Sequence, residues 1–538
     1  MPAHASTYVV FIPLDDPIYE ELDTLNNLGY LEDYIPGVRP ISRVAAAQLV
    51  REANDRMSNE EDGMETDPLA RSILRSLNAE LAQEIGWLKT DTVDNLPTMV
   101  QPLQRAQAEY IFSSGERRTW HSNGGGFNIE ATEATPLLPY NDSLQTSPGS
   151  NEAISMLGWA GFGGFFTLYG EGAFAGPFTR APSGPAGSAT GGRARFVNGE
   201  AVLGLGNFAL SFGKEEMWWG ISRFGALSQG NNGQAFTAIR FQNLKPGHLP
   251  GFLRYLGPLR FQIFFGQLDG DRVFSRPWIC GQILSFRPLP YFEFGFNRAI
   301  MFGGSNNNNY TWLGFLGRAT GFNTGDPSSG NTNSRYGAYA KVYIPQLRNT
   351  QVYYEILGED FFQPFGHGGI KTPFKSPSYT VGVYAPALTA DGRTDIGAEY
   401  TLLDRDYSAH SDSLYWTYHN TLMGDALGPG AWRVNAKAGR WITTQTKVSS
   451  EFFYEHRSLL PFEPPTTLTN NENGWGGAID LLHIPFEVQQ LGSSMGEFQA
   501  RAAVEYVQGI NYSTQNSTRA LVQLTVGFSR TGPGLEWK

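Results

Sequence analysis

The spacing of hydrophobic residues changes once along the chain, at about residue 95. Up to that point apolar side chains recur at helical spacing, which places them on one face of an α-helix. From residue 98 onward apolar and polar residues alternate, which is the period of a β-strand. The sequence therefore predicts a small α-helical bundle over residues 13–95, followed by a β-rich part over residues 98–538.

Three short helices are expected in the N-terminal part. The first begins near Pro17, where the carboxylate of Asp15 or Asp16 can cap its free backbone N–H groups. The second opens at Ser42, and the third spans about 67–88. Short amphipathic helices of this kind need packing against one another to be stable, so a bundle is predicted.

Residues 1–12 precede the first helix and contain Ala3-His-Ala5, a small-residue spacing typical of signal-peptide cleavage sites. This segment is either the remnant of a signal peptide or an N-terminal extension. No window of the chain reaches the roughly 18 uninterrupted apolar residues of a transmembrane helix.

The alternating part of the chain has two features that favour a membrane barrel over a soluble sandwich. Its segments are long, roughly 10–12 residues, and their apolar positions often end in an aromatic residue. Their polar positions carry full charges inside the strands: Glu355, Glu399, Lys437, Lys447, Glu451, Arg501 and Glu505. A barrel accommodates both kinds of position along a strand. Every second side chain meets lipid, and the side chains between them line a wet lumen. The predicted fold is mainly β, a transmembrane antiparallel up-and-down β-barrel of about 18 strands with a small N-terminal α-helical bundle.

The alternation indicates about 18 strands. They run near 104–113, 124–134, 157–173, 201–213, 234–244, 258–268, 277–287, 290–300, 335–345, 349–358, 378–388, 393–403, 412–419, 431–441, 445–456, 475–484, 496–508 and 518–530. Long loops of such barrels face outward. Counted from a periplasmic N-terminus, however, the long loops 302–334 and 359–377 fall inward. One strand before residue 277 is therefore expected to be misassigned.

Composition is consistent with this fold and excludes several functions. Charged residues make up 17% of the chain, and aromatic residues 13%, with 63 glycines for tight turns. Mean hydropathy is −0.30. The net charge of −11 and the lack of a basic cluster argue against nucleic acid as a partner. A single cysteine, Cys280, cannot form an internal disulfide or a thiolate metal site, and no metal or cofactor is expected.

An ordered series of short motifs carries a resemblance to a known family. The series comprises Pro13-Leu-Asp-Asp-Pro-Ile-Tyr19, Trp218-Trp219-Gly220, Arg240-Phe241-Gln242-Asn243-Leu244, Phe265-Gly266-Gln267-Leu268 and Glu293-Phe294-Gly295. With these motifs the chain resembles the capsule-assembly outer-membrane proteins of the Wzi type, across nearly its whole length. Members of that family are described as 18-stranded barrels with a periplasmic helical bundle, and as surface lectins.

The resemblance implies a lectin-like protein that binds and anchors capsular or other surface polysaccharide in the outer membrane, without catalysis. It implies a periplasmic helical bundle, extracellular long loops and contact with outer-membrane lipid. The polysaccharide export machinery is a further candidate partner. The alternative function is an outer-membrane porin or saccharide channel, in which the lumen charges form a permeation path. The two functions differ in whether the lumen is closed: a closed lumen favours the anchor, and an open lumen favours the porin.

Sugar binding requires flat aromatic faces and polar groups that pair with hydroxyls and carboxylates. The segment 214–223 offers both kinds, and it is expected on the same side as loop 302–334. The candidate polysaccharide-binding residues are Lys214, Glu216, Trp218, Trp219, Arg223, Arg298, Tyr310 and Trp312. Trp218 and Trp219 have an alternative interpretation, either in an interfacial belt or wedging a loop into the lumen. Arg298 is also interpreted as a partner in a lumen salt bridge.

Catalysis is not indicated by any motif. The eight histidines are scattered, and neither H-E-x-x-H nor G-x-S-x-G occurs. The acidic pairs Glu215-Glu216 and Glu359-Asp360 are adjacent in sequence, which does not supply the gap that a glycosidase needs across its substrate. The protein is therefore not expected to be an enzyme.

Overall fold

The N-terminal part forms four helices, and an aspartate carboxylate binds the first turn of two of them. They are α1 (Ile18–Asn27), α2 (Arg43–Glu60), α3 (Pro68–Glu80) and α4 (Ala82–Lys89). The Asp16 carboxylate accepts a hydrogen bond from the Ile18 N–H at 3.0 Å, and the Asp67 carboxylate caps α3 in the same way. The predicted third helix is in fact two helices, because Leu81 departs from helical geometry between α3 and α4. None of the described helices is both long and apolar enough to cross a membrane.

The computed structural model describes residues 7–60, 67–89, 96–121, 129–138, 146, 148–176, 193–269, 274–305, 314, 317, 332–359, 377–408, 414–458, 471–487, 494–531 and 534–537.

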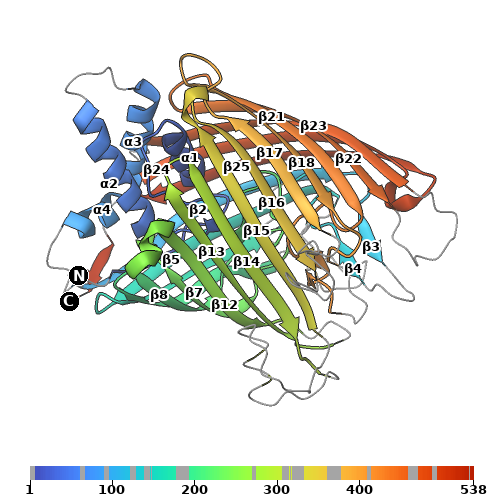
Figure 1. Cartoon of the computed structure of the whole chain (residues 1–538), viewed down its shortest axis with the longest axis horizontal. Helices are drawn as coiled ribbons and strands as arrows, with labels where there is room; N and C mark the ends of the chain where they lie inside the picture. The colour runs from blue at the N-terminus through green and yellow to red at the C-terminus, as the bar shows by residue number, and fades with distance from the viewer. Residues whose placement is uncertain are drawn as a thin grey trace.

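Strands from residue 98 onward close into one antiparallel barrel (Figure 1). Among the described residues, eighteen strands make up its wall. They are β2 (Thr98–Ser114), β5 (Gly149–Phe162), β6 (Phe166–Ala175), β7 (Arg193–Leu205), β8 (Phe208–Lys214), β10 (Thr237–Asn243), β12 (Pro258–Gln267), β13 (Trp278–Leu289), β14 (Phe292–Phe302), β15 (Thr332–Ile344), β16 (Thr350–Glu359), β17 (Ser378–Ala385), β18 (Thr394–Leu403), β21 (Ala431–Trp441), β22 (Thr446–Ser458), β23 (Asn471–Glu487), β24 (Ser494–Gln508) and β25 (Asn516–Arg530). Closure occurs where β2 pairs with both β5 and β25.

The remaining strands are short. Two of them, β11 (Gly247–His248) and β26 (Leu535–Trp537), extend the wall. The others form three small two-stranded sheets apart from it: β1 (Val38–Arg39) with β9 (Trp218–Trp219), β3 (Thr119–His121) with β4 (Glu130–Thr132), and β19 (Thr417–Tyr418) with β20 (Thr421–Leu422).

The predicted number of strands is confirmed, although four of the expected segments were wrong. The segments 157–173 and 201–213 each contain a complete hairpin, turning at 163–165 and 206–207. Tight turns leave the alternation unbroken, so each hairpin looked like one long strand. The segments 124–134 and 412–419 do not belong to the wall. One more strand than expected therefore precedes residue 277, which removes the conflict over the long loops.

The outer face of the wall is apolar where it meets lipid. Phe212 and Ile479 are 59% and 61% exposed, values that a water-facing strand would rarely tolerate. Toward one end of the barrel, aromatic rings on successive strands form a row with centroids 5.3–6.1 Å apart: Tyr354, Tyr379, Tyr400, Trp432 and Tyr454. Aromatic rows of this kind mark the interface between hydrocarbon and water.

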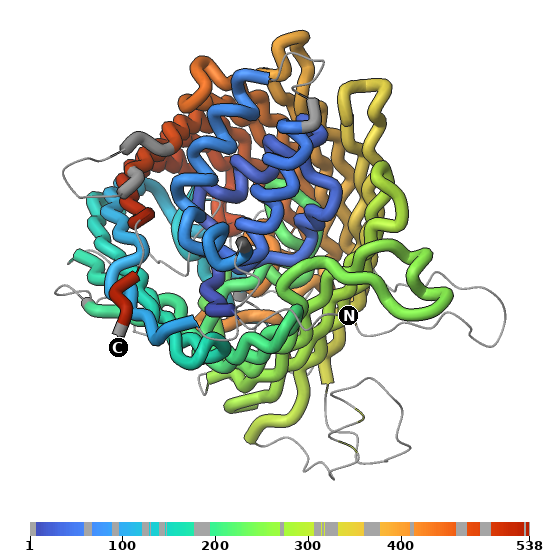
Figure 2. Tube along the Cα trace, turned by 90° about the vertical axis from the view of Figure 1, so that its left-hand side faces the viewer, coloured from blue at the N-terminus to red at the C-terminus, as the bar shows by residue number. Residues whose placement is uncertain are grey.

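The two ends of the barrel differ. The helices α1–α4 lie across one opening, as Figure 2 shows, and short turns such as 206–207 and 290–291 surround them. The long connections, which include those after β14 and β16, leave the strands at the opposite end. We call these the helical end and the long-loop end.

Candidate functional site

The described residues of three connections at the long-loop end fold into the lumen. We call them the inward loops: 115–148 between β2 and β5, 215–236 between β8 and β10, and 404–430 between β18 and β21. Each buries a tryptophan, and Trp120, Trp219 and Trp416 are at most 3% exposed. The inward loops also contact each other, as when the Tyr407 hydroxyl donates to the Leu227 carbonyl at 2.9 Å.

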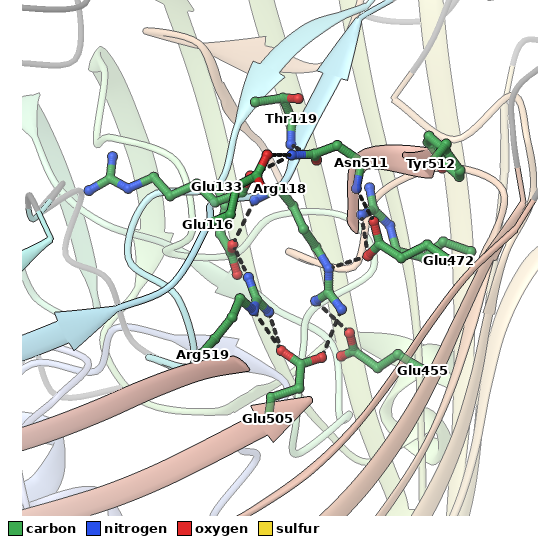
Figure 3. A network of polar contacts seen from close by, with 12 residues as sticks. Glu116, Arg118, Thr119, Glu133, Glu455, Glu472, Glu505, Asn511, Tyr512 and Arg519 are labelled. Atoms are coloured by element: carbon green, nitrogen blue, oxygen red, sulfur yellow. Dashed lines mark hydrogen bonds and ion pairs between the residues drawn. The ribbon is translucent and has the colours of Figure 1, made fainter. Parts of the chain in front are cut away.

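An ionic network ties the first inward loop to the wall (Figure 3). Arg118 donates to Glu455, Glu472 and Glu505 at 2.6, 2.6 and 2.8 Å. These carboxylates come from β22, β23 and β24, and Arg519 of β25 also binds Glu505. All five side chains are at most 10% exposed. Charges buried to this degree are stable only when they are paired, so the network fixes the position of the loop.

The N-terminal segment, residues 7–42, enters the lumen from the helical end and is held by cations of the wall. Arg105 of β2 pairs with Asp15 at 3.2 Å, and Lys447 of β22 pairs with Glu20 at 2.6 Å. Arg260 of β12 donates to two backbone carbonyls just before α2, at 3.2 and 3.1 Å. Strand residues of the polar parity therefore bind the helical part from inside the barrel.

The two sets of lumen segments meet in the small sheet of β1 and β9. Val38 pairs with Trp219, and Arg39 pairs with Trp218. The indole N–H of Trp219 donates to Gln262 of β12 at 2.6 Å, which anchors the junction to the wall. In the part of the chain that the structure describes, the lumen is thus occupied from both ends.

A cavity of about 360 Å³ remains between the N-terminal segment and the inward loop 215–236. Trp218 and Arg223 line it from the loop. The Arg223 guanidinium lies over the ring of Tyr384 at 3.7 Å from the centroid, a cation–π contact. The loop backbone is held in place because the Arg223 N–H and the Ser222 hydroxyl both donate to Glu399 of β18, at 2.6 and 2.8 Å.

Both signs of charge face this cavity. Carboxylates of the N-terminal segment contribute Asp15, Asp16, Glu20 and Asp23, and wall strands contribute Lys341, Lys437, Lys447 and Arg501. Aromatic and paired charged groups can hydrogen-bond and stack against a hydroxyl-rich ligand. Across the described residues, no cluster of three or more histidine, cysteine or acidic side chains is arranged to hold a metal ion.

Five of the predicted binding residues lie in or next to the inward loop 215–236. Lys214 ends β8 and is half-buried, and Arg223 is half-buried in the cavity. Glu216, Trp218 and Trp219 are 3%, 8% and 0% exposed. Of the two interpretations of the tryptophans, the structure agrees with the one in which they wedge a loop into the lumen. The loop starts at the end expected for it, where the connection after β14 also leaves the wall.

The other three predicted residues lie apart from this group. Arg298 belongs to β14 and has the same parity as Phe296, which is 54% exposed on the outer face. Its guanidinium is 5.6 Å from the centroid of the Tyr336 ring. The interpretation of Arg298 as a lumen salt-bridge partner is therefore wrong, because its side chain points away from the lumen. Tyr310 and Trp312 lie outside the described residues.

Buried arginines are the lumen residues that the sequence reasoning missed. Arg240, Arg335, Arg457 and Arg519 are each at most 1% exposed, and each pairs with a glutamate. The available signal was their position on the polar parity of long strands, where a charge needs either lumen water or a partner. That signal indicates that the arginine side chain faces the lumen, but it does not identify the glutamate with which the arginine pairs.

The fold and its filled lumen define a class: a closed, 18-stranded outer-membrane β-barrel with an N-terminal helical part. Residues 120–518 match the family described as capsule assembly protein Wzi, and the chain therefore belongs to this family. The family predicted from the motifs is thereby confirmed.

Two further proteins are similar over different extents. Wzi of Escherichia coli, an outer-membrane protein involved in group 1 capsule assembly and described as a carbohydrate-binding β-barrel, has the same fold. It is 15% identical, with a TM-score of 0.64 over 95% of this chain and 98% of that one. A 55.8 kDa protein encoded in the cps region of Klebsiella pneumoniae is 28% identical over 156 residues. That match spans 28% of this chain and only 30% of the relative.

Proposed function

We propose that this protein is a non-catalytic, lectin-like anchor that binds capsular or other surface polysaccharide and holds it at the cell surface. In this proposal the helical end faces the periplasm and the long-loop end faces the outside. Membership of the capsule assembly family supports the role, and so does the position of the long connections opposite the helices.

The single observation that carries the proposal is the meeting of the two lumen segments at Val38 and Trp219. A porin needs a continuous water-filled path between its two openings. Here the N-terminal segment and the inward loops interlock within the lumen, and ion pairs bind both to the wall. Such a barrel is suited to presenting a rigid surface to a polymer, and many weak contacts along the polymer would act together through avidity.

The candidate residues divide by burial into two roles. Trp218 and Arg223 line the cavity and can touch a ligand, so we assign them to polysaccharide contact. Trp219 and Glu216 are almost fully covered, and we assign them to holding the inward loop in place. The roles of Lys214, Arg298, Tyr310 and Trp312 in glycan binding stay predictions, as does recruitment of the export machinery by the helices.

The first test is the ratio of cell-attached to shed polysaccharide in a deletion strain, with total polymer quantified. The proposal requires unchanged total polymer with a much larger shed fraction. Complementation with Arg223→Gln or Trp218→Ala should restore barrel assembly but only part of the attachment. Arg440→Gln is a matched control, because this arginine forms a half-exposed pair with Asp391 at the helical end. If the deletion leaves attachment unaffected, the anchoring role is wrong and single-channel recording decides whether the protein conducts.

A further inference from the structure

One connection at the helical end does not turn tightly. Residues 244–257 join β10 to β12, whereas the neighbouring hairpins β7–β8 and β13–β14 turn within 206–207 and 290–291. The connection contains β11 and a 3₁₀ helix, η2 (Gly251–Leu256). In Figure 2 the green part of the chain that includes it projects outward beyond the barrel wall.

The side chains of η2 are unusually exposed for their chemistry. Phe252 and Tyr255 are 79% and 73% exposed, and Leu253 is 37% exposed. Leu289 and Tyr291, on the adjacent β13–β14 hairpin, are also exposed, at 43% and 49%. Large apolar side chains that gather on one protruding segment mark a surface that meets a partner or a membrane.

The charge of this connection is opposite to that of the whole protein. The sequence from Leu244 to Pro258 contains Lys245, His248 and Arg254 and no acidic residue, in a chain of net charge −11. The Arg254 guanidinium lies 5.1 Å from the centroid of the Tyr255 ring. Among the described residues, no carboxylate pairs with Lys245 or Arg254. Basic groups beside exposed aromatic rings are typical of segments that lie at the surface of an anionic bilayer.

The connection also continues an aromatic row on the outer face of the wall. Phe208, Phe241 and Phe261, on β8, β10 and β12, have ring centroids 5.4–6.3 Å apart. They lie near the strand ends from which residues 244–257 emerge. An aromatic row of this kind marks the interfacial level of the membrane, so η2 lies just beyond hydrocarbon, at the depth of lipid headgroups.

We propose that η2 is an interfacial membrane anchor, which inserts Phe252, Leu253 and Tyr255 among the headgroups of the adjacent leaflet while Arg254 and Lys245 pair with lipid phosphates. The occupant of this surface is phospholipid rather than a periplasmic protein. Identification of the leaflet as the inner one rests on the orientation proposed above; contact with lipid does not.

The test places an environment-sensitive fluorophore at single cysteines in a Cys280→Ala background of the full chain. Phe252→Cys is compared with Phe212→Cys on the lipid-facing wall, and with Arg71→Cys and Thr514→Cys, which are exposed positions on α3 and at the long-loop end. The proteins are reconstituted in phosphatidylethanolamine–phosphatidylglycerol vesicles that contain lipids spin-labelled near the headgroup or deep in the acyl chain. Acquisition of native heat-modifiable mobility in gels confirms folding of each variant.

The label at 252 should be quenched by the shallow spin label at least about twofold more than the labels at 71 and 514. The label at 212 should respond to the deep spin label. Removal of phosphatidylglycerol should weaken quenching at 252, and Arg254→Gln should reduce that dependence. Quenching at 252 no greater than at 71 would overturn the proposal. Since no polysaccharide is present, the result is independent of the anchoring function.

Discussion

Val38 and Trp219 pair across a two-stranded antiparallel sheet, although the segments that carry them enter the lumen from opposite ends. The N-terminal segment comes from the helical end, and the inward loop 215–236 comes from the long-loop end. Each segment therefore supports the other, and the side chain of Trp219 is completely buried at their junction. The described part of the lumen is therefore occupied jointly by segments from both ends of the barrel, which meet at this sheet.

The interlock predicts a closed barrel. The protein should give no steady current in planar bilayers, because the described lumen segments meet at Val38 and Trp219 and are expected to block a continuous water path. Replacement of residues 215–236 by a short glycine–serine linker should open measurable conductance. Gel mobility before and after heating shows whether the variant is folded. A steady open current in the unaltered protein would contradict the structure.

Detachment of the N-terminal segment is predicted for Arg105→Leu. Arg105 pairs with Asp15 at 3.2 Å and Asp16 at 3.7 Å, so its removal leaves two carboxylates of that segment without their wall cation. Limited proteolysis should then release the helices faster than in the unaltered protein. Arg501→Leu is the matched control, because the ion-pair partners of Arg501, Glu451 and Asp480, both belong to the wall. Equal release in both variants would show that Arg105 does not hold the segment.

The network around Arg118 predicts a large loss of stability in Arg118→Leu. Three glutamates would lose a shared counterion in a nearly water-free site, at a cost of roughly 3–5 kcal/mol. Arg440→Leu removes a pair whose side chains are 48% and 43% exposed, and should cost only about 0–1 kcal/mol. The temperature at which the band of the folded protein disappears from the gel measures the loss of stability in both variants. Similar temperatures for the two variants would refute the structural role of Arg118.

Stability of the helical part should fall as pH rises toward neutrality. The pKa of Glu80 in α3 is raised to about 7, first by burial and then by the nearby Asp16 carboxylate, while Arg43 opposes the rise. A carboxyl group whose pKa is raised on folding binds a proton more tightly in the folded state. Its contribution is thus fully present below its unfolded pKa of about 4.5 and is lost as pH rises through about 7.

Glu80→Gln should therefore flatten the dependence of helix unfolding on pH between about 4.5 and 7. Thermal unfolding of the helices is monitored through their sensitivity to protease at several pH values. The change of the unfolding temperature with pH is the measured slope. Glu32→Gln is the control, because this carboxylate of the same part is 61% exposed. An unchanged slope in Glu80→Gln would mean that another group titrates.

The sequence alone determined most of the secondary structure and the class of fold, because both depend on local periodicity. Alternation along Tyr336–Ile344, for example, assigns each side chain to lipid or lumen without reference to any other strand. The start of the first helix followed from the capping residue Asp16, which acts within one turn. The turn at 206–207 was missed for the same reason, since a tight hairpin preserves the alternation on which the reading depends.

Only the tertiary structure decided which loops enter the lumen and what each lumen charge binds. Arg118 meets Glu505 across 387 positions of sequence, and Arg105 meets Asp15 across 90. A loop has no hydrophobic period that distinguishes inward from outward, so the burial of Trp219 could not be read from its neighbours. Likewise, the sequence around Phe252 does not distinguish it from an apolar residue of a strand. Only the closed wall shows that its side chain lies on the exposed surface of the barrel. Contacts between distant segments depend on barrel closure, and closure is a property of the whole chain.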